Sequence, residues 1–235
     1  MRASQGRNQP LPRSCGRLSG EGTRIILVSV FTASLIVANI TASKIIQLWW
    51  LTFPAGTLAY CITFLCTDLY TEFFGKRETE LVVLAGFVAN ILMVVLVQAA
   101  IMAPIAPFQE GYQEIYANVL APTWRIVLAS MVAYIISQSH DVWAFHFWGK
   151  LTRGKHLWIR NNASTMVSQA IDTLIFTFIA FWGAIDLVNI LNMMATLYVI
   201  KWVIAALDTP FCYLGVHLIR KITNLKPIWL RGDEV

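Results

Sequence analysis

Six long apolar runs, separated by shorter polar segments, dominate the chain. They cover residues 25–47, 53–74, 81–103, 124–147, 161–183 and 194–219. Each run has about the 20 residues that a helix needs to cross a hydrocarbon layer of about 30 Å. The pattern therefore predicts an all-α, polytopic membrane protein with six transmembrane helices.

Basic residues occur in every second segment between these runs. Segments 75–80, 149–160 and 220–235 contain lysine and arginine, whereas 48–52, 104–123 and 184–193 contain neither. Basic segments stay on the cytoplasmic side of a membrane, so we expect a multi-pass protein of the cell membrane with both termini in the cytoplasm.

Residues 1–23 differ in composition from everything that follows them. They are rich in arginine, glycine and serine, and they lack the apolar core of a signal peptide. We predict a disordered cytoplasmic tail over 1–23 and a transmembrane transporter domain over 24–235.

Composition narrows the class of protein further. Of the 235 residues, 57% are hydrophobic and 13% charged, whereas soluble domains are about 25% charged. The net charge of +5 is a signal of membrane topology here, and it does not indicate nucleic-acid binding. The four cysteines lack the spacing of a metal site, so we expect no metal and no cofactor.

The fifth apolar run contains a polar stripe. Ser164, Ser168 and Asp172 recur at every fourth position, so they share one face of a helix. A carboxylate near the middle of a bilayer costs about 2.5–3.5 kcal/mol on insertion scales. Such a residue persists where it faces protein, water or a ligand, and the stripe is therefore a candidate functional site.

Other charged residues also fall within or beside the apolar runs; they are Lys44, Asp68, Glu72, Asp141, Lys201 and Asp208. Glu72 has Lys76 one helical turn away, which favours a structural ion pair for this acid. Lys201 and Asp208 share a helix face, either as an internal relay or as partners for other helices. Ser34, Ala38 and Ala42 form a face of small residues, which favours close helix packing and leaves a docking face for another membrane subunit as the alternative.

Two sequence blocks resemble a known family. The first is TD-x3-E-x2-G, from Thr67 to Gly75, and the second is the string LWIRNNASTMVSQAIDT, from Leu157 to Thr173. Together with HDVWAFHFWGK they resemble the queuosine precursor transporter family, also called the vitamin-uptake-transporter-like or VUT family. The resemblance covers about residues 25–220. It implies a compact six-helix bundle, similar to the substrate-capture subunits of energy-coupling-factor vitamin importers.

The resemblance also implies a substrate, a 7-deazaguanine base, and hence a set of binding residues. Such a base presents paired N–H donors that a carboxylate accepts in bidentate fashion. We expect Asp172 and Gln169 to recognise the base, and Asp68 and Asn39 to line the same cavity. Further candidates for substrate binding are Gln138, Asp141, Trp143 and Asn161; those for coupling or a second-tier role are Lys44, Glu72, Lys201 and Asp208.

The expected function is import of queuosine precursors by a membrane transporter rather than an enzyme. The expected partners are the substrate and the lipid bilayer, with an energy-coupling membrane subunit or a second copy of the chain as open alternatives. A capture subunit that needs an ATP-driven partner stays an alternative, because the chain has no Walker motif of its own. An intramembrane enzyme is the remaining alternative, although no GxSxG or HExxH motif supports it.

Overall fold

A computed structural model describes residues 19–151, 157–223 and 225–228. Its elements are helix α1 (Gly20–Thr41), strands β1 (Ile45–Leu48) and β2 (Leu51–Pro54), helices α2 (Gly56–Phe74) and α3 (Lys76–Met102), the 3-10 helix η1 (Pro107–Tyr112), and helices α4 (Gln113–Leu120), α5 (Thr123–Leu151), α6 (Leu157–Phe181) and α7 (Leu187–Thr223). The all-α membrane class is thereby confirmed, with one short hairpin added.

The six predicted spans overlap α1, α2, α3, α5, α6 and α7, but three boundaries were wrong. Gln47 and Phe53, expected at helix ends, pair within the β1–β2 hairpin, where Gln47 lies opposite Thr52. The last helix begins at Leu187 rather than at residue 194, because Asp186 accepts a hydrogen bond from the backbone N–H of Asn189 at 3.2 Å and caps it. This bond also holds the pKa of Asp186 below its ordinary value.

Four stretches of the described chain are long and apolar enough to cross a membrane: Gly20–Thr41, Lys76–Met102, Gln113–Asp141 and Leu187–Ala205. Helix α2 carries Asp68 and Glu72 and is less apolar than these four, and the described side chains of α6 form a shorter apolar stretch, Thr165–Phe181. The count of six spans therefore stays a prediction. The 1–23 tail also stays a prediction: residues 1–18 lie outside the described residues, and α1 already begins at Gly20.

The distribution of side chains is that of a protein in lipid. Large apolar residues of α3, such as Leu84, Val88 and Leu92, are exposed, whereas Asn90 on the opposite side is 2% exposed. The Asn90 carboxamide oxygen accepts a hydrogen bond of 2.9 Å from Asn39 of α1. Apolar surface thus faces outward and polar groups pair between helices, as the solvation of a bilayer requires.

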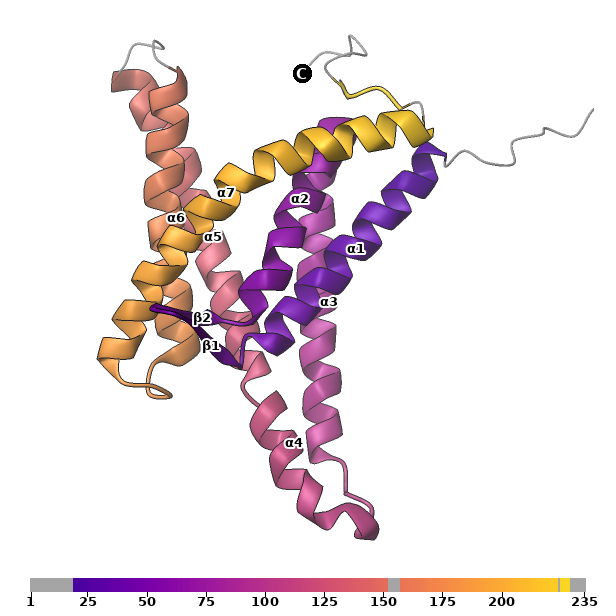
Figure 1. Ribbon diagram of the computed structural model, residues 1–235, viewed down its shortest axis with the longest axis vertical. Helices are drawn as coiled ribbons and strands as arrows, with labels where there is room; N and C mark the ends of the chain where they lie inside the picture. Colours follow the sequence, from indigo (N-terminus) through magenta and orange to yellow (C-terminus); the bar gives the residue numbers. More distant parts are fainter. Residues whose placement is uncertain (1–18, 152–156, 224, 229–235) are drawn as a thin grey trace, which may run out of the picture.

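The helices form two groups that α7 joins (Figure 1). Helices α1, α2 and α3 pack together on one side, α5 and α6 pack along each other on the other side, and α7 contacts both α2 and α6. Pro210 lies inside α7, where its missing N–H and its ring favour a bend. The start of α1 and the ends of α2, α5 and α7 lie at one end of the molecule, opposite the hairpin and α4 (Figure 1).

The hairpin end of the molecule is closed by an apolar cluster. Phe53 of the hairpin and Ala42 are buried with residues of α5, α6 and α7, among them Ile126, Phe181 and Met193. The hairpin therefore fastens the two helix groups to each other at this end.

At the same end of the molecule, Arg125 of α5 forms hydrogen bonds with the end of α6. Its Nε donates to the carbonyl oxygen of Ile179 at 2.5 Å, and its Nη2 donates to the carbonyl oxygen of Trp182. The last carbonyls of a helix have no partner within that helix and carry partial negative charge, so a guanidinium is well suited to them. Arg125 thus caps the end of α6.

We expect Arg125→Met to lower the free energy of unfolding of the detergent-solubilised protein by about 2 kcal/mol, because two hydrogen bonds from a charged donor are lost. Arg125→Lys keeps the charge but lacks the planar fork, so it should restore only part of the loss. Thermal unfolding followed by intrinsic tryptophan fluorescence measures both variants. Equal stability of Arg125→Met and the unchanged protein would show that the cap contributes nothing.

Candidate functional site

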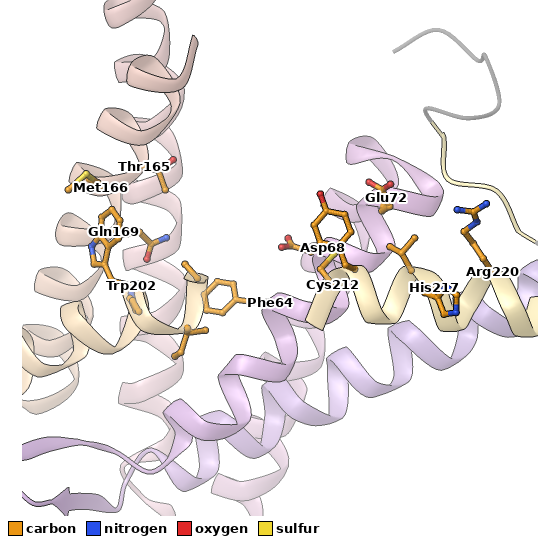
Figure 2. Close-up of a pocket in the computed structure, with 15 residues that line it drawn as sticks. Phe64, Asp68, Glu72, Thr165, Met166, Gln169, Trp202, Cys212, His217 and Arg220 are labelled. Atoms are coloured by element: carbon orange, nitrogen blue, oxygen red, sulfur yellow. The ribbon is translucent and has the colours of Figure 1, made fainter. Parts of the chain in front are cut away.

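A cavity of about 1050 Å³ lies between α2, α6 and α7. Its polar and aromatic lining residues are Phe64, Asp68, Glu72, Thr165, Gln169, Lys201, Trp202, Tyr213, His217 and Arg220. Figure 2 shows Gln169 on the α6 side and Asp68 on the α2 side, both pointing toward the space between these helices. The volume is at the upper end of the range of small-molecule sites, which is about 300–1000 Å³.

The cavity is built from helix faces that repeat every fourth residue. Tyr60, Phe64, Asp68 and Glu72 follow one another along α2 at this spacing, so they project from one side of it. On α7, residues on both sides of Pro210 line the cavity, from Lys201 to Arg220. One helix thus contributes both apolar and charged groups to a single wall.

A second, smaller cavity of about 70 Å³ lies next to the first. Its lining includes Asn39, Tyr60, Ser130, Asp172 and Thr173, together with Pro54 and Gly56 beside the hairpin. Phe64, Lys201 and Ile204 line both cavities, and they therefore form the partition between them.

Asp172 forms an ion pair with Lys201 across α6 and α7. The two side chains are 23% and 16% exposed, so the pair is largely withdrawn from solvent. The hydroxyl of Ser137 on α5 lies 3.4 Å from Asp172 Oδ1 and 3.1 Å from the carbonyl oxygen of Tyr134, and these two acceptors share its proton. The cost of the buried carboxylate is thus offset by a cation and a hydroxyl from two other helices.

Asp141 is held by a separate group of side chains. The Ser168 hydroxyl donates to Asp141 Oδ1 at 3.2 Å, and the His140 Nδ1 lies 3.0 Å from the same Ser168 oxygen. Asp141 lines neither cavity. Asp172 and Asp141 therefore belong to one α5–α6 interface, and only Asp172 also reaches a cavity.

The structure brings together some of the residues expected at the site and separates others. Asp68, Glu72, Gln169 and Lys201 line the large cavity; Asn39, Asp172 and Lys201 line the small one. Gln138 and Lys44 are exposed and line neither cavity. Trp143 is 61% exposed and stacks on Phe147, so it too lines neither. The side chains of Asn161 and Asp208 lie outside the described residues.

The sequence alone did not point to Phe64, Tyr60, Tyr213, His217 or Arg220 as cavity residues. Tyr60 and Phe64 precede Asp68 at intervals of four residues, and this spacing could have identified these two. No such signal was available for the residues of α7, because their place depends on the path of the helix beyond Pro210. Among the described residues, no group of three or more His, Cys, Asp or Glu side chains could hold a metal ion.

Comparison with known proteins adds a family. A family model described as "Putative vitamin uptake transporter" matches residues 54–215. The "Probable queuosine precursor transporter" of Bacillus subtilis is 29% identical over 189 residues, which are 78% of this chain and 80% of that protein. The "Queuosine precursor transporter" of Escherichia coli is 28% identical over 131 residues, which are 56% of each protein.

A third relative, the "Probable queuosine precursor transporter" of Haemophilus influenzae, is 30% identical over 132 residues, which are 56% of this chain and 53% of that protein. The chain thus aligns with about half the length of the second and third relatives. No solved structure matches the chain significantly.

Proposed function

Because the chain belongs to the vitamin uptake transporter family, whose model matches most of it, we propose that the protein imports queuosine precursors across the cell membrane. These substrates are 7-deazaguanine-type bases. The names of the three relatives support this substrate, and the cavity between α2, α6 and α7 is the observation that carries the proposal. A passive helix bundle has no need for a cavity of about 1050 Å³ that is lined by acids, an amide and an indole.

The chemistry of the cavity fits a planar base rich in N–H donors. The Asp68 carboxylate is suited to accept the paired donors of the ring N–H and the exocyclic amine. The Gln169 amide offers both a donor and an acceptor to the carbonyl edge from the opposite wall. Trp202 supplies a ring face on which the base can stack.

The orientation of the cavity in the membrane is part of the proposal. The end of the molecule that carries the ends of α2 and α5 also carries the start of α3, with Lys76 and Arg77, and the end of α7, with Arg220 and Lys221 (Figure 1). If six helices cross the bilayer, this end faces the cytoplasm and the hairpin faces outward. The large cavity then opens toward the cytoplasm, and the apolar cluster beneath the hairpin closes the outer side.

A binding titration of the purified protein tests the proposed substrate. We expect a deazaguanine base to bind and adenine to bind at least about tenfold more weakly, because adenine lacks both the ring N–H beside an exocyclic amine and the carbonyl, and a built site rejects a wrong pattern of donors and acceptors. Guanine presents the same edge as a deazaguanine and differs only at position 7, so its titration measures what recognition of position 7 adds. Asp68→Asn should weaken binding about 30-fold through loss of a charged acceptor, and Gln169→Leu about tenfold through loss of one neutral hydrogen bond.

Asp186→Asn is the matched control for these variants. Asp186 is exposed at the start of α7 and lines neither cavity, and asparagine caps a helix about as well as aspartate does. This variant should bind the base normally. Absence of binding to any deazapurine by the unchanged protein would contradict the proposed function, and uptake by the chain alone in proteoliposomes would exclude an obligatory ATP-driven partner.

A further inference from the structure

Two serine–aspartate pairs connect helices α5 and α6, and in each pair the serine comes from one helix and the aspartate from the other. Ser137 and Asp141 lie one turn apart on α5, and Ser168 and Asp172 lie one turn apart on α6. Ser137 contacts Asp172 at 3.4 Å, and Ser168 contacts Asp141 at 3.2 Å. The antiparallel helices therefore carry two polar rungs, one turn apart, which we call the Ser–Asp ladder.

One rung of the ladder ends on a histidine. If the Ser168 hydroxyl donates to Asp141, the hydrogen bond of 3.0 Å to His140 requires the Nδ1–H of the imidazole as its donor. His140, Ser168 and Asp141 then form one chain of donors and acceptors. A proton passes along such a chain when the hydroxyl oxygen accepts one proton and releases its own, so the serine is chemically unchanged after the transfer.

The other rung ends on Lys201. Asp172 contacts the Ser137 hydroxyl of α5 and forms an ion pair with the Lys201 ammonium of α7. Asp172, Lys201 and Tyr60 of α2 all line the small cavity. Lys201 also lines the large cavity, where Asp68 and Glu72 provide carboxylates on α2. A proton on Asp172 would neutralise this acid and release the ammonium of Lys201, which keeps its own charge.

The distance between the rungs is short. Ser168 and Asp172 are separated by four residues on α6, a rise of about 6 Å, which one hydrogen-bonded water molecule can bridge. Thr165, Met166 and Gln169 of α6 line the large cavity on either side of Ser168 in the sequence. The ladder thus runs directly behind the α6 wall of the cavity.

We propose that the Ser–Asp ladder, together with His140 and Lys201, carries the proton whose inward movement drives uptake. This inference rests on the proposed transport function. Asp172 takes up a proton and releases Lys201 while the substrate enters. The proton then passes from Asp172 through one water molecule to the Ser168 oxygen, and the Ser168 hydroxyl turns from Asp141 and gives its own proton to the Nδ1 of His140 in the tautomer that carries hydrogen on Nε2. His140, one turn nearer the end of the molecule assigned to the cytoplasm, releases the Nε2 proton at that end, and the ion pair of Asp172 and Lys201 re-forms.

Helix packing alone accounts less well for these residues. Hydroxyl and amide groups are enough to link membrane helices, as Asn39 and Asn90 do in this protein. Two carboxylates and an imidazole cost far more within a bilayer, and in membrane proteins such groups mark proton relays and ion pathways. Imidazole is also the side chain whose protonation changes near neutral pH, as a group that exchanges protons with the cytoplasm requires.

Two transport assays in proteoliposomes separate coupling from transport itself. The first measures accumulation of a radiolabelled deazaguanine base with the outside at about pH 6 and the inside at about pH 7.5, a range over which histidine titrates. The second measures counterflow, the exchange of labelled for unlabelled base at equal pH, which needs no net movement of protons. We expect the gradient to raise accumulation by the unchanged protein about fivefold or more, and a protonophore to remove the increase.

Ser168→Ala and His140→Gln interrupt the ladder without touching either cavity. Both should lose the response to the gradient and keep counterflow within about twofold of the unchanged protein, because general acid–base groups act on proton transfer alone. Ser168→Thr retains a hydroxyl and should keep the response. Ser139→Ala is the matched control, since the Ser139 hydroxyl donates to the Ile135 carbonyl of its own helix at 2.7 Å.

The outcomes are distinguishable. If the unchanged protein shows neither accumulation nor counterflow, the transport function and the coupling inference fail together. If counterflow is present but the gradient has no effect, or if both ladder variants keep the full response, the coupling inference alone is wrong. Loss of counterflow in His140→Gln and in both Ser168 variants would assign the ladder a structural role and would also overturn the inference.

Discussion

Asp172→Asn is expected to abolish uptake of the base and to destabilise the protein. The change leaves the Lys201 ammonium, which is 16% exposed, without its carboxylate. Removal of one member of a buried ion pair costs about 3–5 kcal/mol, because the remaining charge is left without compensation in a medium of low polarity. We expect a loss of about 3 kcal/mol in the free energy of unfolding and a decrease in uptake of at least about 100-fold.

The double variant Asp172→Asn with Lys201→Met separates the two effects. With both charges removed, no isolated charge remains, so stability should return to within about 1 kcal/mol of that of the unchanged protein. Uptake should stay lost, because neither the acid nor the cation is available. Thermal unfolding and uptake measured on all four proteins complete the double-mutant cycle. Additive losses of stability in the two single variants would show that the two side chains do not interact.

Gly56→Ala is expected to destabilise the fold by a similar amount. A Cβ at Gly56 would lie 2.0 Å from the backbone oxygen of Ala38 and 3.1 Å from the Cβ of Ala42. The obstacle on α1 is backbone rather than a flexible side chain, so α1 and α2 would have to separate. Alanine normally favours a helix over glycine by about 1 kcal/mol, but forced overpacking costs about 1–3 kcal/mol or more. We expect a net loss of about 3 kcal/mol and poor recovery of folded protein.

Gly111→Ala controls for the exchange of glycine for alanine. Apart from Gly111 and its two chain neighbours, no atom of the described residues lies within 4 Å of the position that a Cβ would take there, so this variant should unfold like the unchanged protein. Thermal unfolding and size-exclusion chromatography in detergent report both variants. Normal stability of Gly56→Ala would show that α1 and α2 are not held at this short distance. The contact also gives the small residues Ala38 and Ala42 their role, which is close packing of α1 on α2.

The positions of helices followed from the sequence because transfer into lipid acts on each residue independently of its neighbours in space. An apolar run of about 20 residues forms a helix in a bilayer whatever surrounds it, since every backbone group must find a partner within the segment. The β1–β2 hairpin was missed because its residues are as apolar as the adjoining helices. In its turn, Trp49 has a φ of 56°, which is uncommon for residues other than glycine, so a tryptophan at this position does not predict a turn.

The site was predicted in part for a similar reason. The cost of a charge in lipid is local, so Asp68, Glu72, Asp172 and Lys201 were recognisable as candidates one by one. Their partners were not. For Lys201 an internal relay with Asp208 and a partner on another helix were both open, and the structure pairs it with Asp172 of α6. The spacing of seven residues between Lys201 and Asp208 places both on one face of α7, but it does not show which other helix that face contacts.

The sequence by itself determined the membrane class, the helical segments, the acids that needed partners and the family. The tertiary structure decided which groups share a cavity: Asp68 and Gln169 line the large one, Asn39 and Asp172 the small one, and Asp141 neither. The physical reason is that hydropathy and helical period are properties of one segment, whereas a cavity is the space left between several. Its lining depends on close approaches such as that of Gly56 to Ala38 and on the course of α7 around Pro210, which only the packed helices fix together.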